Sequence, residues 1–245
     1  MRARRRERRN RIFVWMLLAL SLCAMAVSGY KVWGAWQADR AGADNYAQLA
    51  GLARPDPEIP GGPIDFPALR TVNPDAAAWL YCPDTVIDYP ILRATEYDYF
   101  LRHLPDGTYN ANGTLFIDYN WKDFSDKLLV IYGHNMKSGR MFGSLTNYKG
   151  QDYYDSHPYL YLYTEQGERY RIDLVYGCVI GAGQWRDRAF MFDVNIDSLI
   201  AYAAYNTTFK SNAQYTPGDR VVALSTCSYE FDDARYVLLG ILQPG

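Results

Sequence analysis

The chain has 245 residues, of which 49% are hydrophobic and 16% aromatic, and this composition is ample for a packed core. Its formal net charge of −2 is unevenly distributed, because residues 1–11 (MRARRRERRNR) contribute +6 and the remainder carries −8. An acidic body argues against a nucleic-acid partner, which would require a basic surface.

The N-terminal region has the pattern of a membrane anchor. Residues 12–30 contain no charged side chain, and this run is long enough to cross a bilayer as a helix. The arginine-rich arm lies just before it, so the positive-inside rule keeps the N-terminus in the cytoplasm. We therefore expect a cytoplasmic basic arm at 1–11, a transmembrane anchor at 12–31 and a body outside the cell membrane. A cleaved signal peptide is the alternative, because Ala24-Met25-Ala26 has the form of a cleavage site.

A helix and a linker are predicted to follow the anchor. Residues 35–52 are rich in alanine and continue the helical pattern from the membrane. The next stretch, ARPDPEIPGGP at 53–63, contains four prolines and two glycines, which is typical of a linker. We therefore assign 32–63 to a juxtamembrane helix and linker, and 64–245 to one globular domain of ordinary size.

Short apolar segments dominate the predicted globular domain, which indicates a mainly β fold. They are rich in Val, Ile, Leu and Tyr and are bounded by turn residues. In chain order they read AWLYC, VIDYPIL, GTLFIDY, KLLVIYG, YLYLYT, YRIDLVYGCVI, RVVALSTC and RYVLLGIL. Eight such segments predict a closed eight-stranded β-barrel. An insertion between the sixth and seventh segments, at 184–219, contains one helical stretch and has the length of a functional excursion.

Of the three histidines, only His134 has the position of a functional side chain. His103 is expected at the end of a short helix, where capping explains it, and His157 precedes a proline at a turn. His134 directly follows the strand LLVIYG and begins a loop, and strand ends commonly deliver side chains to a site.

Three cysteines follow the predicted anchor, so at least one thiol is unpaired. Cys82 and Cys178 fall within strand patterns and are expected to be buried core thiols. No two histidines or cysteines have a zinc-type spacing, which makes a structural zinc site improbable. Cys227, in contrast, ends an apolar strand, where an unpaired thiol in an oxidising compartment needs a use.

Cys227, His134 and Arg235 form a candidate nucleophilic site. A thiol nucleophile needs an imidazole for proton transfer and a donor for the developing oxyanion. If the strands at Cys227 and Arg235 are antiparallel neighbours, their eight-residue separation brings the two side chains to the same barrel rim. Spacing alone is equally compatible with a buried Cys227 and an unrelated surface Arg235.

At these residues the sequence resembles the sortases, and class B sortases in particular. The family's cysteine motif, Thr-Leu-x-Thr-Cys followed by an arginine on the next strand, is matched by ALSTC and Arg235, with Ala223 replacing the first threonine. The histidine region is similar to YGHNMKSGRMFGSL. The segments DYPIL, YDYFLRHLPDGTYNANGTLFIDY and YDSHPYLYLYT also resemble class B sequences, so the similarity extends from about Trp79 to Leu242. The basic arm, the single anchor and the helix-containing insertion are similar to the same class.

The resemblance implies a catalytic domain at 64–245 with a sortase-type barrel and a defined chemistry. Cys227 would attack the carbonyl after the threonine of a C-terminal sorting signal and form a thioester. His134 would protonate the leaving amine and deprotonate the incoming one, and Arg235 would hold substrate carbonyls and the oxyanion. Leu101, Tyr132 and Ser225 match positions that line the peptide groove in class B relatives.

The resemblance also implies the partners. They are surface proteins with a sorting signal, an amino group of peptidoglycan or of its lipid-linked precursor, and the membrane, with no metal or organic cofactor. A pilus-assembling sortase is the nearest alternative. A cell-envelope cysteine peptidase acting by hydrolysis is disfavoured in its papain-like form, where the cysteine precedes the histidine in sequence. A catalytically inactive binding module would require one of the three site residues to be missing, and all three are present.

Overall fold

In the computed structural model, the described residues are 2–54, 62–94, 96, 98–118, 121, 124, 126–185 and 196–245. Most of the predicted linker at 53–63 and the first part of the insertion at 184–219 lie outside this set. The chain divides into two compact units, one ending at Ala43 and the other spanning Asp44–Gly245.

The predicted anchor and juxtamembrane segment form one continuous helix, α1 (Arg2–Ala53). The part from Asn10 onward is long and apolar enough to cross a membrane, by length and composition. The last turns of α1 belong to the second unit. There Tyr46 is buried, and its hydroxyl donates a hydrogen bond to the carbonyl of Gly113. The compact second unit therefore begins at Asp44, ahead of the boundary expected at 64.

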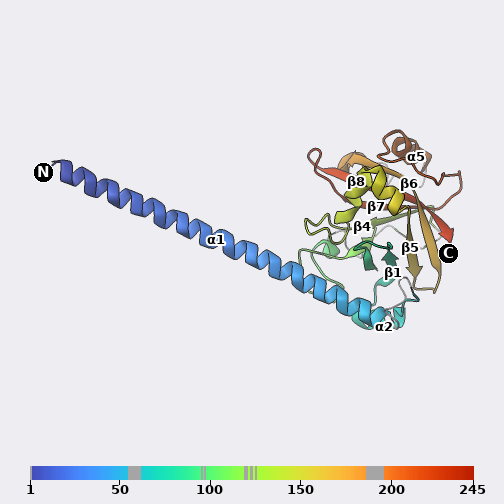
Figure 1. The fold of residues 1–245 in the computed structure, drawn as a ribbon. Helices are drawn as coiled ribbons and strands as arrows, with labels where there is room; N and C mark the ends of the chain where they lie inside the picture. Colours follow the sequence, from blue (N-terminus) through green and yellow to red (C-terminus); the bar gives the residue numbers. More distant parts are fainter. Residues whose placement is uncertain are drawn as a thin grey trace. The chain divides into compact units, whose positions relative to one another are not determined.

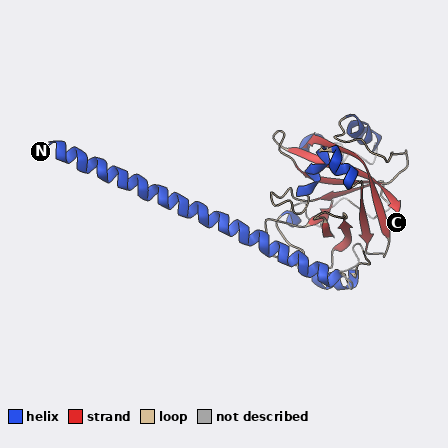
Figure 2. Cartoon of the chain, viewed as in Figure 1, coloured by secondary structure: helices blue, strands red, loops and turns tan. Residues whose placement is uncertain are grey.

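The second unit is a closed barrel with strand order β1-β2-β3-β4-β7-β8-β6-β5, and it confirms the predicted fold class (Figures 1 and 2). All eight apolar segments form strands. Their bounds are β1 Ala76–Tyr81, β2 Asp88–Arg93, β3 Leu115–Ile117, β4 Leu128–Tyr132, β5 Tyr159–Thr164, β6 Arg169–Gly181, β7 Val221–Cys227 and β8 Ala234–Pro244. Two neighbouring pairs are parallel, β2 with β3 and β4 with β7. The pairing of β4 with β7 brings two segments that are distant in sequence to the same rim of the barrel.

The described residues of the second unit also include several short helices outside the sheet. They are α2 Phe66–Val72, η1 Tyr99–Leu101, η2 Gly143–Lys149, α3 Gln151–Ser156 and α5 Ile196–Tyr205. At the start of α2, the Asp65 carboxylate accepts a hydrogen bond from the Ala68 amide at 2.9 Å, which is an N-cap interaction. The predicted helix of the insertion is α5.

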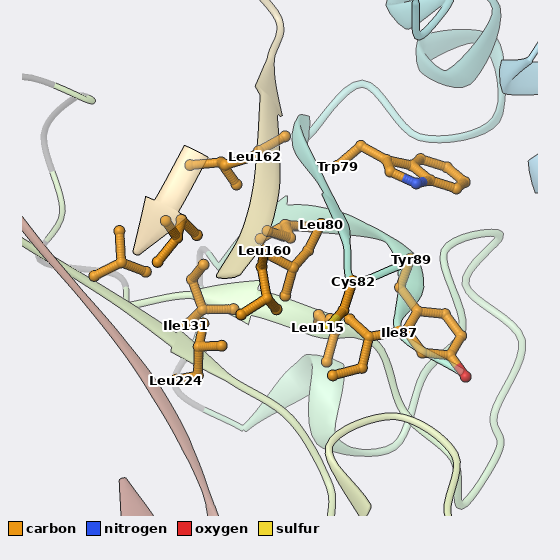
Figure 3. Close-up of a cluster of buried hydrophobic side chains, with 14 of the residues drawn as sticks. Trp79, Leu80, Cys82, Ile87, Tyr89, Leu115, Ile131, Leu160, Leu162 and Leu224 are labelled. Carbon is orange, nitrogen blue, oxygen red and sulfur yellow. The ribbon is translucent and has the colours of Figure 1, made fainter. Parts of the chain in front are cut away.

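Two hydrophobic clusters stabilise the barrel. The larger one fills its interior, where alternate residues of the strands point inward; Figure 3 shows Leu80, Leu115, Ile131, Leu160 and Leu224 there. The smaller one lies between the helix α5 and strands β4, β6, β7 and β8. It contains Leu199, Ile200 and Ala203, whose helical spacing gives α5 one apolar face. Burying each such Leu or Ile contributes about 1.5–3 kcal/mol to stability.

Candidate active site

The β7–β8 hairpin places Cys227 and Arg235 directly opposite each other. The two strands are antiparallel, and the last pair of their register is Cys227 with Arg235. The turn is closed by a hydrogen bond from the Ser228 amide to the Ala234 carbonyl at 2.8 Å. A guanidinium nitrogen of Arg235, Nη1, lies 2.6 Å from Cys227 Sγ and donates toward it. The predicted strand pairing is thus confirmed, and Arg235 faces the thiol.

The parallel pairing of β4 with β7 brings His134 to the same rim. Tyr132 pairs with Ser225, so continuing this register by two residues places His134 beside Cys227. Two hydrogen bonds continue the β4–β7 pairing beyond the end of β4. The Gly133 amide donates to the Ser225 carbonyl at 3.2 Å, and the Thr226 hydroxyl donates to the Gly133 carbonyl at 2.8 Å.

Gly133 is required where the chain leaves β4 for the His134 loop. A Cβ atom at this position would lie 2.4 Å from a methyl carbon of Leu115 and 2.7 Å from the ring of Phe142. Neither Leu115 nor Phe142 can move away easily, because both side chains are fully buried in the close-packed core. The residue before His134 is therefore held close to the core by packing, which fixes where the loop begins.

The His134 loop is held to both sides of the site by side-chain hydrogen bonds. His134 Nε2 lies 2.6 Å from the carbonyl oxygen of Leu101, at the end of η1. A carbonyl can only accept, so Nε2 carries a proton and Nδ1 is the nitrogen left for proton exchange. Asn135 Nδ2 donates to the carbonyl of Cys227 at 2.8 Å. Among the described residues, no hydrogen bond joins His134 directly to Cys227.

All six predicted site residues line one pocket of about 140 Å³. The three with expected catalytic roles are His134, Cys227 and Arg235, and the three with expected substrate contacts are Leu101, Tyr132 and Ser225. The Ser225 hydroxyl is buried and has no hydrogen-bond partner among the described residues. A buried polar group without a partner is costly, and such a group in a pocket can be satisfied by a ligand.

The other two cysteines of the second unit are buried thiols, as predicted. Cys178 lies in β6, and Cys82 lies immediately after β1 rather than within it. Figure 3 shows Cys82 among Leu115 and Ile87. Burial raises the pKa of the Cys178 thiol to about 12 and also raises the pKa of Cys82. Both side chains are therefore protonated, unreactive thiols at neutral pH.

The remaining histidines have the capping and turn positions that the sequence predicts. His103 follows η1, a 3₁₀ turn, and its Nδ1 lies 2.7 Å from the Tyr99 carbonyl. His157 directly follows α3 as its C-cap, with its Nδ1 at 3.0 Å from the Tyr153 carbonyl. In the described part of the chain, no three His, Cys, Asp or Glu side chains are grouped so that they could hold a metal ion.

Some residues at the site were not predicted to belong to it. Asn135 and Thr226 tie the His134 loop to β7, and Trp185 lines the pocket from the start of the insertion. Asn135 and Thr226 each neighbour a predicted catalytic residue in sequence, and this proximity is the sequence feature that could have indicated them. Trp185 had no such feature, because its place in the pocket depends on how the chain turns directly after β6.

Comparison with known proteins identifies the family. No family model matches the chain. "Sortase B" of Listeria monocytogenes serovar 1/2a (strain ATCC BAA-679 / EGD-e) is 32% identical over 179 residues, which are 71% of this chain and 72% of that protein. The chain belongs to the class B sortases. It is accordingly a sortase-type cysteine transpeptidase.

Solved sortase B structures have the same fold. Sortase B of Bacillus anthracis in complex with AAEK1 is 26% identical and superposes with a TM-score of 0.73, covering 86% of this chain and all (100%) of that one. A Staphylococcus aureus sortase B–substrate complex superposes with a TM-score of 0.74 at 20% identity, covering 84% of this chain and 98% of that one. The closed barrel is therefore the class B sortase barrel.

Proposed function

We propose that this sortase is a membrane-anchored enzyme that cleaves a C-terminal sorting signal after threonine and transfers the protein to an amino group of peptidoglycan or its precursor. The observation that carries the proposal is the contact of Arg235 with Cys227 Sγ in a pocket that His134 also lines. This arrangement supplies a nucleophile, a cationic donor and a proton carrier.

The first half-reaction uses these three side chains. The Cys227 thiol gives its proton to His134 Nδ1 as its sulfur attacks the carbonyl carbon of the threonine, and the carbonyl oxygen becomes negatively charged. The Arg235 guanidinium, 2.6 Å from the sulfur, lies where its N–H groups can donate to that oxygen. The C–N bond breaks as His134 gives a proton to the leaving amine, which forms a thioester on Cys227. Since Nε2 is hydrogen-bonded to the Leu101 carbonyl, Nδ1 is the nitrogen that exchanges this proton.

Leu101, Tyr132 and Ser225 are proposed to bind the sorting peptide. Leu101 and the half-buried Tyr132 give the pocket apolar walls, and Tyr132 packs on Phe116 at a ring distance of 5.4 Å. The Ser225 hydroxyl, which has no hydrogen-bond partner in the described part of the chain, offers a hydrogen bond to a backbone amide of the peptide. A Staphylococcus aureus sortase B of similar fold is solved as a substrate complex, which supports a substrate-binding role for a barrel of this kind.

The N-terminal segment is proposed to anchor the enzyme with its N-terminus in the cytoplasm and its catalytic domain outside. The support is the uncharged stretch at 12–30 within α1, together with the seven arginines of the preceding arm. Substrates on the cell surface and an acceptor in the wall would then be on the same side of the membrane as Cys227.

A panel of fluorogenic sorting peptides, incubated with the full-length chain in detergent micelles, tests the proposal. We expect cleavage of at least one threonine-containing signal, with the amine product beginning after the threonine, and none by the Cys227→Ala variant. Mass spectrometry of enzyme from a reaction stopped before completion should show the peptide attached to Cys227 as a thioester. Cleavage that persists in Cys227→Ala, or no cleavage of any peptide, would contradict the proposal.

A further inference from the structure

The last turns of α1 belong to the second unit, and Tyr46 lies buried among them. Its side chain is only 6% exposed, although the same helix contains the proposed anchor, and it does not line the catalytic pocket. Burial raises the pKa of the Tyr46 hydroxyl, so the group keeps its proton and can donate a hydrogen bond. The acceptor of that hydrogen bond lies in a segment that packs against the site.

The Tyr46 hydroxyl donates to the carbonyl of Gly113. Gly113 has a left-handed backbone, with a φ of 59°, and lies close against the backbone of η1. A Cβ atom at Gly113 would lie 2.6 Å from the carbonyl oxygen of Phe100 and 2.8 Å from that of Leu101. The next amide, of Thr114, donates to the Phe100 carbonyl at 2.8 Å. Tyr46 therefore restrains the segment that packs against η1.

The Leu101 carbonyl oxygen has a second neighbour, the imidazole of His134. It accepts the hydrogen bond from His134 Nε2 at 2.6 Å, and the same oxygen faces Gly113. Because this bond occupies Nε2, it orients the ring and leaves Nδ1 for proton transfer. The Tyr46 hydroxyl thus acts, through Gly113, on the atom that orients the imidazole.

A second set of contacts joins Tyr46 to the His134 loop. The ring of Tyr46 packs edge-on against that of Tyr89 in β2, with ring centroids 5.1 Å apart. The Tyr89 hydroxyl accepts a hydrogen bond from the Met141 amide at 3.3 Å. Met141 is buried, has a left-handed backbone with a φ of 53°, and pairs with Asn135, the residue after His134. A methionine keeps such a backbone only where its surroundings hold it, so Tyr89 helps to fix the loop.

We propose that Tyr46 is a positioning residue for His134. This inference rests on the proposed function, because it gives the Tyr46 hydroxyl a part in proton transfer that it plays only through His134. The hydroxyl holds Gly113 against η1, which keeps the Leu101 carbonyl where Nε2 can bond to it. With Nε2 held, Nδ1 keeps the orientation that proton transfer needs. Small displacements of a reacting group lower rates strongly, so a single distant hydrogen bond has a measurable effect.

The Tyr46→Phe variant tests the inference, because it removes one hydroxyl and keeps the ring that packs on Tyr89. Tyr154→Phe is the matched control. Tyr154 is also buried, its hydroxyl accepts a hydrogen bond from the Asn212 amide at 2.8 Å, and it does not line the catalytic pocket. Both variants are made in the full-length chain in detergent micelles. They are assayed with a fluorogenic sorting peptide well below the lower of their melting temperatures, so that both are folded.

We expect Tyr46→Phe to lower kcat about tenfold and to keep KM within about twofold of the wild-type value. The reason for this split is that the peptide pocket is intact while His134 is less well placed. Tyr154→Phe should keep the wild-type kcat and KM, since its lost hydrogen bond has no connection to the imidazole. A merely structural role of Tyr46 would give the same kinetic result as the control.

Nuclear magnetic resonance of ¹⁵N-labelled histidine rings shows whether the effect passes through His134. The chain has three histidines, and the signals of His134 are those that are missing from the His134→Ala spectrum. In Tyr46→Phe the Nε2–H signal of His134 should shift or broaden, because its hydrogen bond to the Leu101 carbonyl is less well fixed. In Tyr154→Phe this signal should keep its wild-type position.

A wild-type kcat in folded Tyr46→Phe, an equal loss of kcat in Tyr154→Phe, or a lower kcat with an unmoved His134 signal would overturn the positioning role. Absence of sorting-peptide cleavage by the wild type would instead contradict the proposed function. In that case the histidine spectra would still decide whether Tyr46 holds the imidazole.

Discussion

The β7–β8 hairpin and the His134 loop supply the two halves of the site by different physical means. In the hairpin, Cys227 and Arg235 are placed by a regular antiparallel ladder that continues through both strands. In the loop, His134 is placed by a close-packed glycine and by side-chain hydrogen bonds to Leu101 and Cys227. A ladder distributes its restraint over many backbone bonds, whereas the loop depends on a few specific contacts. Substitutions in the hairpin should therefore remove groups that take part in the reaction, whereas substitutions in the loop should act by displacing His134.

The largest effect is expected from removing the reacting groups of both halves. Cys227→Ala should abolish peptide cleavage, because no thioester can form. The cleavage rate of His134→Ala should be almost as low, because the leaving amine is no longer protonated. The measurement is cleavage of a fluorogenic sorting peptide at equal enzyme concentration. Cys82→Ala, which changes a buried thiol of the same molecule, is the control and should keep most of its turnover. Substantial cleavage by Cys227→Ala would rule out the thiol mechanism.

Arg235→Lys tests whether the hairpin provides geometry or only charge. Lysine keeps the charge, but its ammonium cannot reproduce the planar set of guanidinium donors. Losing one oxyanion donor typically lowers turnover by about 10²–10³-fold, and we expect an effect of that size on kcat. Circular dichroism and the melting temperature should stay close to wild type, since Arg235 is only half-buried. Near-normal cleavage by a folded Arg235→Lys protein would mean that Arg235 is a surface charge with no part in the reaction.

Asn135→Ala should reveal the dependence of the loop on single contacts. It removes the hydrogen bond to the Cys227 carbonyl, so we expect a loss of about 1 kcal/mol in stability. Looser placement of His134 should lower kcat about tenfold with a smaller change in KM, because the peptide pocket is kept.

Asn206→Ala is the matched control for this prediction. Asn206 makes a similar side-chain hydrogen bond to the Tyr202 carbonyl at 2.8 Å, and neither residue lines the catalytic pocket. It should show a comparable or smaller stability cost and wild-type kcat. If both variants slow the enzyme equally, Asn135 has no positioning role.

The same contrast explains what could be predicted from the sequence. The strands were predictable because each is a short apolar run with clear boundaries. The single turn between two such runs made a Cys227–Arg235 pairing possible, but spacing alone was equally compatible with an unrelated surface Arg235, and the structure decided between them. The adjacency of β4 and β7 was not predictable, because a parallel pair joins residues far apart in sequence and no local pattern encodes it. The hydrogen bond from His134 to the Leu101 carbonyl was also beyond reach, since any residue type supplies a carbonyl.

The smallest effect on turnover is expected from the buried thiols Cys82 and Cys178, which lie away from both halves of the site. Changing either to alanine should cost on the order of 1 kcal/mol in stability and leave most peptide cleavage intact. Loss of turnover with an unchanged melting temperature in either variant would show that the reactive thiol has been misassigned.

The pKa of Cys178 also predicts how stability changes with pH. In the folded protein burial raises this pKa to about 12, whereas an unfolded cysteine ionises near its ordinary value of about 8.5. Above that value the unfolded state loses a proton that the folded state keeps, so the free energy of unfolding falls as pH rises towards the folded pKa. Cys178→Ala lacks this ionisation and should lose less stability between about pH 8 and pH 10, measured by urea denaturation at each pH. A loss equal to that of the wild type would mean that the Cys178 thiol ionises as readily in the folded protein as in the unfolded chain, and that its burial has no electrostatic consequence.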